Sequence, residues 1–270
     1  MSRHVNLSSY EGVETLATFD DVSFGKYCKA KLASAQAHVD FLSTQLSLGQ
    51  DARVCEIGSG NGRLLYALER AGMLSSGVGY EVSNTRHLFA QKFGAWLSSK
   101  QVVNKCASVL DAPPEQNMDL VIGVDVVTCL IGPVAADAER GMTKWAFDSL
   151  KPGGRLVLEL WDLSRRQRKI ADDGGETRSF QEFPAEDPWE FVLETLRLDQ
   201  NRDIVWNKLF LRRGSRERSV KEMVLRSYPK PRAEEMLRAA GFEGVRFFDA
   251  WRPDVPMVDG EYIVVASKPG

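Results

Sequence analysis

The 270-residue chain has no long hydrophobic run, no excess of one charge and few cysteines. A membrane-spanning helix needs roughly 20 consecutive apolar residues, and the best candidate, residues 120–136, is interrupted by Asp125, Thr128 and Pro133. Lys and Arg number 35 while Asp and Glu number 37, so the chain has no overall field that would attract nucleic acid or acidic lipid. From these absences we expect no membrane partner, and we consider nucleic acid an unlikely partner.

The cysteines lie far apart in the sequence, at positions 28, 55, 106 and 129. Their spacing fits neither a zinc site nor a small disulfide framework, and the polar start of the chain lacks the apolar core of a secretion signal. We therefore expect reduced thiols, no bound metal and a cytoplasmic location. A hydrophobic fraction of 43% with 27% charged residues is typical of a folded globular protein rather than a disordered one.

Hydrophobic periodicity predicts an α/β fold. Before residue 52, apolar residues recur at three- and four-residue steps, which predicts a helix over 26–48. From residue 52 onward, short apolar runs alternate with helical patterns. Strands are expected at 53–57, 77–81, 102–107, 119–124 and 154–161, and helices at 63–71, 84–98 and 135–150. This alternation predicts a Rossmann-like, mostly parallel sheet with helices on both faces.

The alternation stops after residue 161. Three segments, 189–198, 204–212 and 219–228, are joined by short polar connections and predict an antiparallel meander. A helix that ends near Gly241 and two last strands, 245–251 and 261–266, follow it. We therefore divide the chain into an N-terminal helical lid, residues 1–50, and an α/β domain, residues 51–270. An antiparallel sheet at about 163–228 is inserted after the fifth strand of that domain.

A glycine-rich loop carries the strongest functional signal. A strand ends at Ile57, glycines follow at every second position (Gly58, Gly60 and Gly62), and a helix begins. Such a helix start presents free N–H groups to a ligand. The spacing differs from the Gly-x-Gly-x-x-Gly of dinucleotide folds, and Glu56 would repel a pyrophosphate but attract an ammonium group. The loop therefore favours S-adenosylmethionine over NAD.

Together with later residues, the loop resembles the class I S-adenosylmethionine-dependent methyltransferases of the small-molecule type. The resemblance runs from about 52 to 160 and includes the acid Glu81, Asp111 in Ser108-Val-Leu-Asp111, and Leu150-Lys-Pro-Gly-Gly154. It implies that the loop lies under the methionine part of the donor, that Glu81 holds the ribose hydroxyls, and that Asp111 accepts from the adenine amino group. The donor site that we expect comprises Tyr27, Glu56, Gly58, Ser59, Gly60, Gly62, Glu81, Leu110, Asp111 and Val124.

Residues for catalysis are harder to assign. The three histidines are His4, His38 and His87, and the position where the family often has one after the fourth strand is Cys129. Two acids, Asp125 and Asp162, follow strands at the edge where open α/β sheets bind ligands. With Tyr228 they are the catalytic candidates. Each acid has a structural alternative: Asp125 as a helix N-cap and Asp162 as an ordinary loop acid.

The predicted meander bears on the substrate. Small-molecule members of this family often carry such a sheet as a roof over the acceptor, and this one is rich in aromatic residues. Residues 202–232 include ten Lys or Arg against three acids, which suits either an anionic acceptor or a solvated surface. We predict methyl transfer to nitrogen or oxygen of a small molecule, mainly by positioning, and slightly favour nitrogen because no strong base is visible. The alternatives are an RNA or protein methyltransferase and a donor-binding module without activity. The sequence assigns no oligomeric state.

Overall fold

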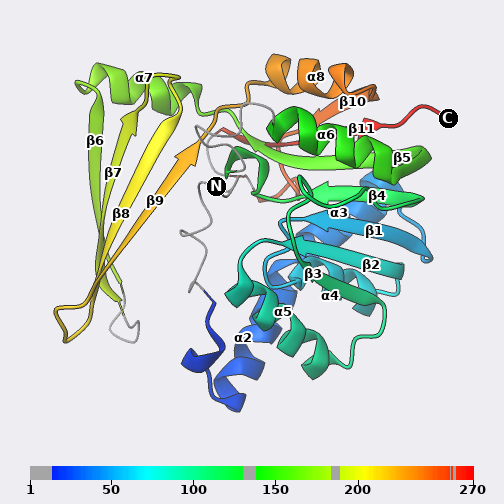
Figure 1. Ribbon diagram of the computed structural model, residues 1–270, viewed down its shortest axis with the longest axis horizontal. Helices are drawn as coiled ribbons and strands as arrows, with labels where there is room; N and C mark the ends of the chain where they lie inside the picture. The colour runs from blue at the N-terminus through cyan, green and yellow to red at the C-terminus, as the bar shows by residue number, and fades with distance from the viewer. Residues whose placement is uncertain (1–13, 130–137, 184–188, 256, 258–259) are drawn as a thin grey trace.

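A seven-stranded sheet is the centre of the molecule (Figure 1). The computed structural model describes residues 14–129, 138–183, 189–255, 257 and 260–270, and the counts below refer to these residues. The strand order is β10-β11-β5-β4-β1-β2-β3. The strand bounds are β1 Ala52–Ile57, β2 Leu74–Glu81, β3 Val102–Cys106, β4 Met118–Gly123, β5 Leu150–Trp161, β10 Glu243–Phe248 and β11 Glu261–Ser267. The first five of these strands run parallel, and β11 is antiparallel to both its neighbours.

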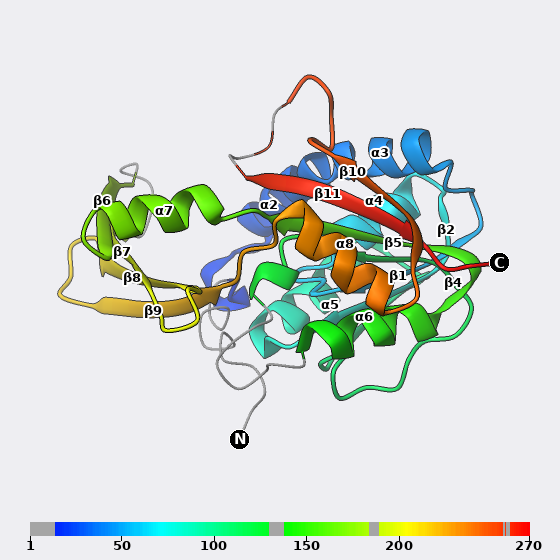
Figure 2. The same ribbon diagram turned by 90° about the horizontal axis from the view of Figure 1, so that it is seen from above.

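Helices cover both faces of this sheet (Figure 2). The middle strands are apolar on both sides because each face is buried under a helix layer. One layer includes α3 and α4, which pack on β1, and the other includes α6 and α8. The helix bounds are α2 Asp21–Ser34, α3 Gln36–Leu46, α4 Arg63–Arg70, α5 Asn84–Leu97, α6 Ala138–Ser149, α7 Ser164–Asp172 and α8 Lys230–Ala239, with short 3-10 turns η1 Leu16–Thr18 and η2 Val127–Cys129. The predicted Rossmann-like fold is confirmed.

Two helices replace the single one predicted over 26–48. The first begins earlier because Asp20 accepts a hydrogen bond from the backbone N–H of Ser23 at 2.7 Å, which caps it. At Ala35 the backbone N–H donates to Leu32 three residues back rather than four, and the axis breaks there. The apolar period continues through the break, so the pattern alone did not reveal it. Residues 135–137 of another predicted helix lie outside the described residues.

A second, four-stranded antiparallel sheet of order β6-β7-β8-β9 stands at one end of the molecule (Figure 1). Its strands are β6 Glu176–Glu182, β7 Trp189–Leu198, β8 Ile204–Arg212 and β9 Arg218–Leu225. The predicted bounds of β7 and β8 are confirmed, and β9 ends earlier than expected. The sequence missed α7 and β6 because α7 buries only Ile170 and β6 is an exposed edge strand of mostly polar residues. Neither segment has the apolar period on which the prediction depends.

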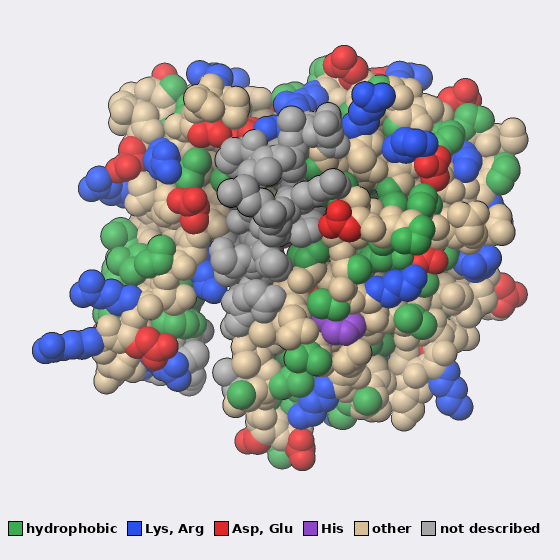
Figure 3. Space-filling view, viewed as in Figure 1, with side chains coloured by type: hydrophobic (Ala, Val, Ile, Leu, Met, Phe, Trp, Pro, Cys, Tyr) green, Lys and Arg blue, Asp and Glu red, His purple; other side chains and the backbone are tan. Residues whose placement is uncertain are grey.

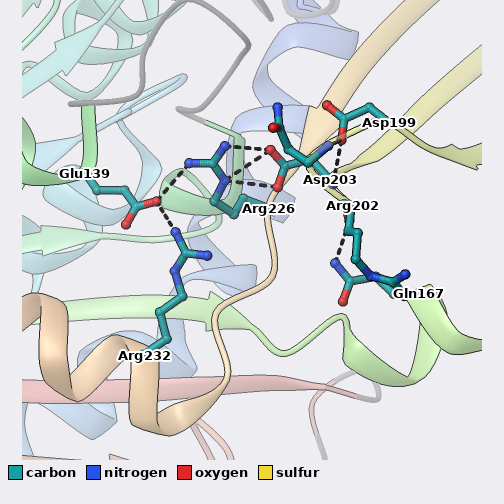
Figure 4. A network of polar contacts seen from close by, with 8 residues as sticks. Glu139, Gln167, Asp199, Arg202, Asp203, Arg226 and Arg232 are labelled. Carbon is teal, nitrogen blue, oxygen red and sulfur yellow. Dashed lines mark hydrogen bonds and ion pairs between the residues drawn. The ribbon is translucent and has the colours of Figure 1, made fainter.

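Ion pairs fasten this second sheet to the central one (Figure 4). Arg226, just after β9, donates to both oxygens of the buried Asp203 in the β7–β8 turn, with Nη2–Oδ2 at 2.6 Å, and to Glu139 of α6 at 3.1 Å. Arg232 of α8 donates to the same Glu139 at 2.6 Å. The backbone N–H of Arg226 donates to Thr128 at 3.1 Å. One arginine therefore joins the inserted sheet, α6 and the turn η2.

None of the helices in the described part of the chain is both long and apolar enough to cross a membrane.

We expect Arg226→Met to lower the free energy of unfolding by about 3 kcal/mol, because it leaves the buried Asp203 carboxylate without its cationic partner. Urea denaturation measures this. The control is Arg238→Met, which breaks the exposed pair with Glu234 one turn away in α8 and should cost less than about 0.5 kcal/mol. Equal losses in the two variants would show that the network does not fasten the sheet.

Candidate functional site

A cavity of about 910 Å³ lies where the parallel strands end. Residues after β1, β2, β3 and β4 line one part of it, and β8 and β9 of the second sheet line another. The carboxyl edge of an open α/β sheet is the usual ligand position in such folds. The N-terminal helices contribute Lys31 and His38 to the wall. The cavity therefore has a sheet-edge half and a half under the second sheet.

The glycine loop between β1 and α4 requires glycine. Gly58, Gly60 and Gly62 all have positive φ, at 67°, 56° and 78°. A Cβ on Gly58 would come within 2.4 Å of Val126, and one on Gly60 would come within 2.4 Å of the Arg86 guanidinium. Any larger residue would therefore both strain the backbone and collide with a neighbour. Gly58 itself lines the cavity.

Two buried polar side chains in this wall are without partners. Among the described residues, neither Oε2 of Glu56 nor Oγ of Ser59 has a hydrogen-bond partner, and both residues line the cavity. Burial raises the pKa of Glu56 to about 8. Buried polar groups are nearly always paired, so this wall fits a ligand with a cationic or hydrogen-bonding group. The ammonium of S-adenosylmethionine is such a group.

Glu81, at the end of β2, is fixed in place by backbone groups. Its Oε2 accepts from the N–H of Gly60 at 2.8 Å, and its Oε1 accepts from the N–H of Ser83 at 2.8 Å. Arg86 lies 3.8 Å from Oε2. A carboxylate has about four lone-pair positions, so Glu81 retains acceptors for a ribose diol. It lines the cavity beside the loop.

The remaining predicted donor residues divide into two groups. Val124 lines the cavity, but Asp111 is exposed outside it and Leu110 packs against the hydrophobic core. The chain turns after β3, where the N–H groups of Asp111 and Ala112 both donate to the carbonyl of Ser108. This turn places Ser108 in the cavity wall and Asp111 outside it.

Tyr27 lies behind the loop, in a contact that the sequence did not predict. Its hydroxyl donates to Glu14 at 2.6 Å, and Glu14 also accepts from Asn61 at 2.7 Å and from Nε of Arg86 at 3.2 Å. Burial opposes ionisation of Glu14, but Arg86 and these hydrogen bonds outweigh it and hold its pKa below the usual value. Glu14 thus fastens the segment before α2 to the glycine loop. A contact across 47 residues of sequence has no local signal.

In the half of the cavity under the second sheet, Asp125 is the main acidic side chain. It follows β4 with a left-handed φ of 51°, a strained conformation for a residue other than glycine. It lines the cavity, and its side chain is exposed there. Desolvation by the surrounding protein, with the charge of Glu261, raises its pKa to about 6. Asp125 is therefore mostly ionised at neutral pH and close enough to titration to accept a proton.

Buried hydrogen-bonding groups without partners also line this cavity. Among the described residues, Oγ1 of Thr128 and the indole N–H groups of Trp161 and Trp206 are buried without partners, and all three residues line the cavity. Lys208 lies over the Trp206 ring, with Nζ 3.5 Å from its centroid. This half is thus aromatic and polar, which suits a ligand with both an apolar body and polar groups.

The other two catalytic candidates do not line the cavity. Asp162 lies just before α7 and accepts from the backbone N–H of Ser164 at 2.9 Å, which agrees with its alternative as an ordinary loop acid. Tyr228 is fully buried in the hydrophobic core, and its backbone carbonyl accepts from the Tyr262 hydroxyl.

His38 lines the cavity, although the sequence marked it only as part of a helix. It is buried and stacks on Trp251, with ring centroids 4.5 Å apart. Burial lowers its pKa to about 4, so its imidazole is neutral at physiological pH. His87 does not line the cavity, and His4 lies outside the described residues. Within the described part of the chain, no three His, Cys, Asp or Glu side chains are arranged to hold a metal ion.

Comparisons with known proteins agree with this geometry. A family model described as a methyltransferase domain matches residues 27–246. No curated protein sequence matches the chain at a significant level. The solved CcbJ methyltransferase from Streptomyces caelestis is 20% identical with a TM-score of 0.70, and the match covers 87% of this chain and 95% of that one.

Two further solved structures share the fold. A S-adenosylmethionine-dependent methyltransferase from Clostridium acetobutylicum is 15% identical with a TM-score of 0.69, over 87% of this chain and 91% of that one. CalS10 from Micromonospora echinaspora, an amino pentose methyltransferase, is 17% identical with a TM-score of 0.61, over 93% of this chain and 97% of that one. The CalS10 structure contains S-adenosylmethionine.

Glu56 and Glu81 differ in their hydrogen-bond partners. Replacing each with glutamine should therefore have opposite effects on the stability of the ligand-free protein. Because burial raises the pKa of Glu56 to about 8, the folded state binds a proton that the unfolded state has lost, and stability falls as pH rises from about 4.5 to 8. Glu56→Gln should match the wild type at low pH and exceed it by a few kcal/mol at pH 8. Glu81→Gln should instead cost about 1–2 kcal/mol, since one backbone N–H loses its acceptor.

Urea denaturation of both variants across that pH range measures these differences. A loss of stability in Glu56→Gln at pH 8 would contradict the assignment of Glu56 as an unpaired buried carboxyl.

Proposed function

The chain belongs to the methyltransferase-domain family and uses S-adenosylmethionine as its cofactor, and from this premise we propose that it methylates the nitrogen of a small-molecule amine. The observation that carries this proposal is the Asp125 carboxylate, which opens into the acceptor half of the cavity with a pKa near 6.

The donor site that we propose uses the sheet-edge half of the cavity. Glu56 would take the ammonium of the methionine part and Glu81 the ribose hydroxyls, because one has an unused oxygen and the other has unused lone pairs. Ser108, Val109 and Val124 would surround the adenine. When bound, S-adenosylmethionine supplies an electrophilic methyl group on a positively charged sulfur. The protein then has to position the acceptor and remove one proton from it.

Asp125 is suited to both tasks for an amine. Its negative charge attracts an ammonium group, and Trp161 adds an aromatic side chain to the cavity wall that favours a cation. An ammonium nitrogen has no free lone pair, so one of its protons must first pass to an oxygen of Asp125, and from there to solvent, before the neutral nitrogen can attack. A hydroxyl acceptor would need a stronger base, because its proton is far less acidic than that of an ammonium.

The second sheet favours a small, enclosed acceptor over RNA or protein. The basic residues of 202–232 do not form one outward patch, since Lys208 and Lys221 line the cavity while Arg226 and Arg232 are paired in the network with Glu139. Lys208 and Lys221 would suit an anionic group at the far end of the acceptor. CalS10 is described as an amino pentose methyltransferase and KedS8 as a sugar N-methyltransferase, which supports a nitrogen acceptor on this fold.

We also propose that the residues before β1 and the second sheet act as a lid and a roof. Lys31 and His38 close one side of the cavity, and Trp206, Lys208 and Met223 close another. The enclosure excludes water from the donor and acceptor while they react.

The test is turnover of matched acceptor pairs that differ only in an amino or a hydroxyl group, with and without a phosphate at the other end. We expect S-adenosylhomocysteine and a monomethylated product from the amines, fastest with the phosphorylated ones. Turnover of the hydroxyl members alone would overturn the nitrogen assignment. Donor binding without turnover of any acceptor would favour a non-catalytic binding module.

We expect Asp125→Asn to lower kcat/KM for an amine acceptor at least about 100-fold, because it removes the proton acceptor. The wild-type kcat/KM should fall as pH drops through about 6, where Asp125 becomes protonated, and the variant should lose this limb of the profile. Asp162→Asn is the matched control, because Asp162 is a loop acid just before α7 that does not line the cavity. An unchanged pH profile in Asp125→Asn would contradict its role, whatever the loss of rate.

A further inference from the structure

Arg86 of α5 lies between two buried carboxylates. Its Nε donates to Oε2 of Glu14 at 3.2 Å, whereas its Nη1 lies 3.8 Å from Oε2 of Glu81. Both acids are 5% exposed, and Arg86 lines the cavity beside Glu81. The first contact is a hydrogen bond and the second is too long to be one. The guanidinium is therefore bonded to the acid that precedes α2 and stands apart from the acid at the end of β2.

Glu14 is fixed from its other side. Its Oε1 accepts from the Tyr27 hydroxyl at 2.6 Å and from Nδ2 of Asn61 at 2.7 Å. The amide of Asn61 is itself oriented, because its Oδ1 accepts from the backbone N–H of Arg63 at 3.1 Å. Burial opposes the ionisation of Glu14, but Arg86 and these hydrogen bonds outweigh it and hold its pKa below the usual value. One oxygen of the carboxylate thus binds neutral groups, and the other is presented to Arg86.

The space beside the glycine loop would let Arg86 reach Glu81. Gly60 has no side chain there, and a Cβ on it would come within 2.4 Å of Nη2 of Arg86. A movement of about 1 Å would bring Nη1 within hydrogen-bond distance of Oε2 of Glu81. A charge-assisted bond of that kind is stronger than one between neutral groups. In the structure the bond to Glu14 holds the guanidinium on the other side of this gap.

A bond from Arg86 would leave Glu81 with too few acceptor positions for the donor. Its two oxygens already accept from the backbone N–H groups of Gly60 and Ser83. A carboxylate has about four lone-pair positions, so about two remain for the two hydroxyl groups of a ribose. A further bond from the guanidinium would take one of these two positions.

We propose that Glu14 is a positioning residue for donor binding, which holds Arg86 back from Glu81 and so keeps two acceptor positions of that carboxylate for the ribose. This inference rests on the proposed donor site, in which Glu81 takes the ribose hydroxyls. It gives the N-terminal segment a task other than closing the cavity, because Glu14 acts through the charge of Arg86 and not by covering the donor.

Isothermal titration calorimetry of S-adenosylhomocysteine binding to the full-length chain tests the proposal. We expect Glu14→Gln to raise the dissociation constant about tenfold, because one ribose hydrogen bond to a charged group is lost. The amide keeps its oxygen for Tyr27 and Asn61 but turns an N–H toward Arg86. The guanidinium then bonds to Glu81 and competes with the ribose.

A second substitution separates this role from a purely structural one. When Arg86→Met is added to Glu14→Gln, no guanidinium remains to compete, so the dissociation constant should return to within about threefold of the wild type. If Glu14 only fastened the N-terminal segment, removing Arg86 as well would loosen that segment further and weaken binding more. Restoration would also show that the loss in the single variant is not a failure to fold.

Binding of 5′-methylthioadenosine locates the effect within the donor. This nucleoside has the ribose and the adenine but lacks the amino acid part. It should therefore lose the same factor in Glu14→Gln as S-adenosylhomocysteine does. A general loosening of the glycine loop would instead weaken S-adenosylhomocysteine more, because the loop lies beside the methionine part in the proposed site.

The matched control is Asp21→Asn. Asp21 of α2 pairs with Lys92 of α5 at 3.8 Å, so this pair also joins the N-terminal segment to α5. The Asp21 side chain is fully exposed, and acidic side chains are visible on the surface where α2 lies (Figure 3). The pair contacts neither the glycine loop nor Glu81, so the dissociation constant of this control should not change.

An unchanged dissociation constant in Glu14→Gln, or a double variant that binds no better than the single one, would overturn the proposal. Glu81→Gln distinguishes this result from a failure of the donor site, since it should weaken S-adenosylhomocysteine at least about tenfold. If Glu81→Gln binds as the wild type does, the donor site is wrong and the proposal falls with it. If Glu81→Gln weakens binding and Glu14→Gln does not, the donor site stands and only this proposal fails.

Discussion

A buried carboxyl without a partner, Glu56, is the feature on which the site depends. A buried carboxyl without a partner is unfavourable, so it persists only where the fold requires it. Here β1 places Glu56 at the carboxyl edge of a sheet that is covered on both faces. The next residues must then turn sharply without closing over it, which requires the glycines at 58, 60 and 62. The same turn brings the N–H of Gly60 onto Glu81 and thereby fixes the second carboxylate. One constraint thus connects the strand, the loop and both acids.

The inserted sheet forms the half of the cavity in which we propose that the acceptor binds. One of its faces supplies Trp206 and Lys208 to the cavity, and the Arg226 ion pairs fasten it to α6. The backbone N–H of Arg226 also donates to Thr128 in η2, three residues after Asp125. The position of the sheet and the position of the segment that carries Asp125 are therefore connected through one arginine.

Sequence reasoning succeeded where a local pattern has one physical cause. Alternating apolar residues located β7 and β8, and glycines beside an acid identified the loop, because pleat and backbone dihedrals act over a few residues. It failed for α7 and β6, which are held by pairing and not by an apolar face. The sequence did not show that Ser108 lines the cavity while Asp111 lies outside its wall, because the turn after β3 depends on backbone hydrogen bonds to Ser108. Glu14 and His38 were missed because their role comes only from contacts between distant segments.

Isothermal titration calorimetry of S-adenosylmethionine binding, repeated in buffers of different ionisation enthalpy, tests the central claim most directly. The ligand-free Glu56 is mostly protonated at pH 7, because burial raises its pKa to about 8. An ammonium group bound against it should therefore displace nearly one proton per donor, and this release should vanish in Glu56→Gln. Binding with no dependence on the buffer, or no binding at all, would show that Glu56 does not hold the donor.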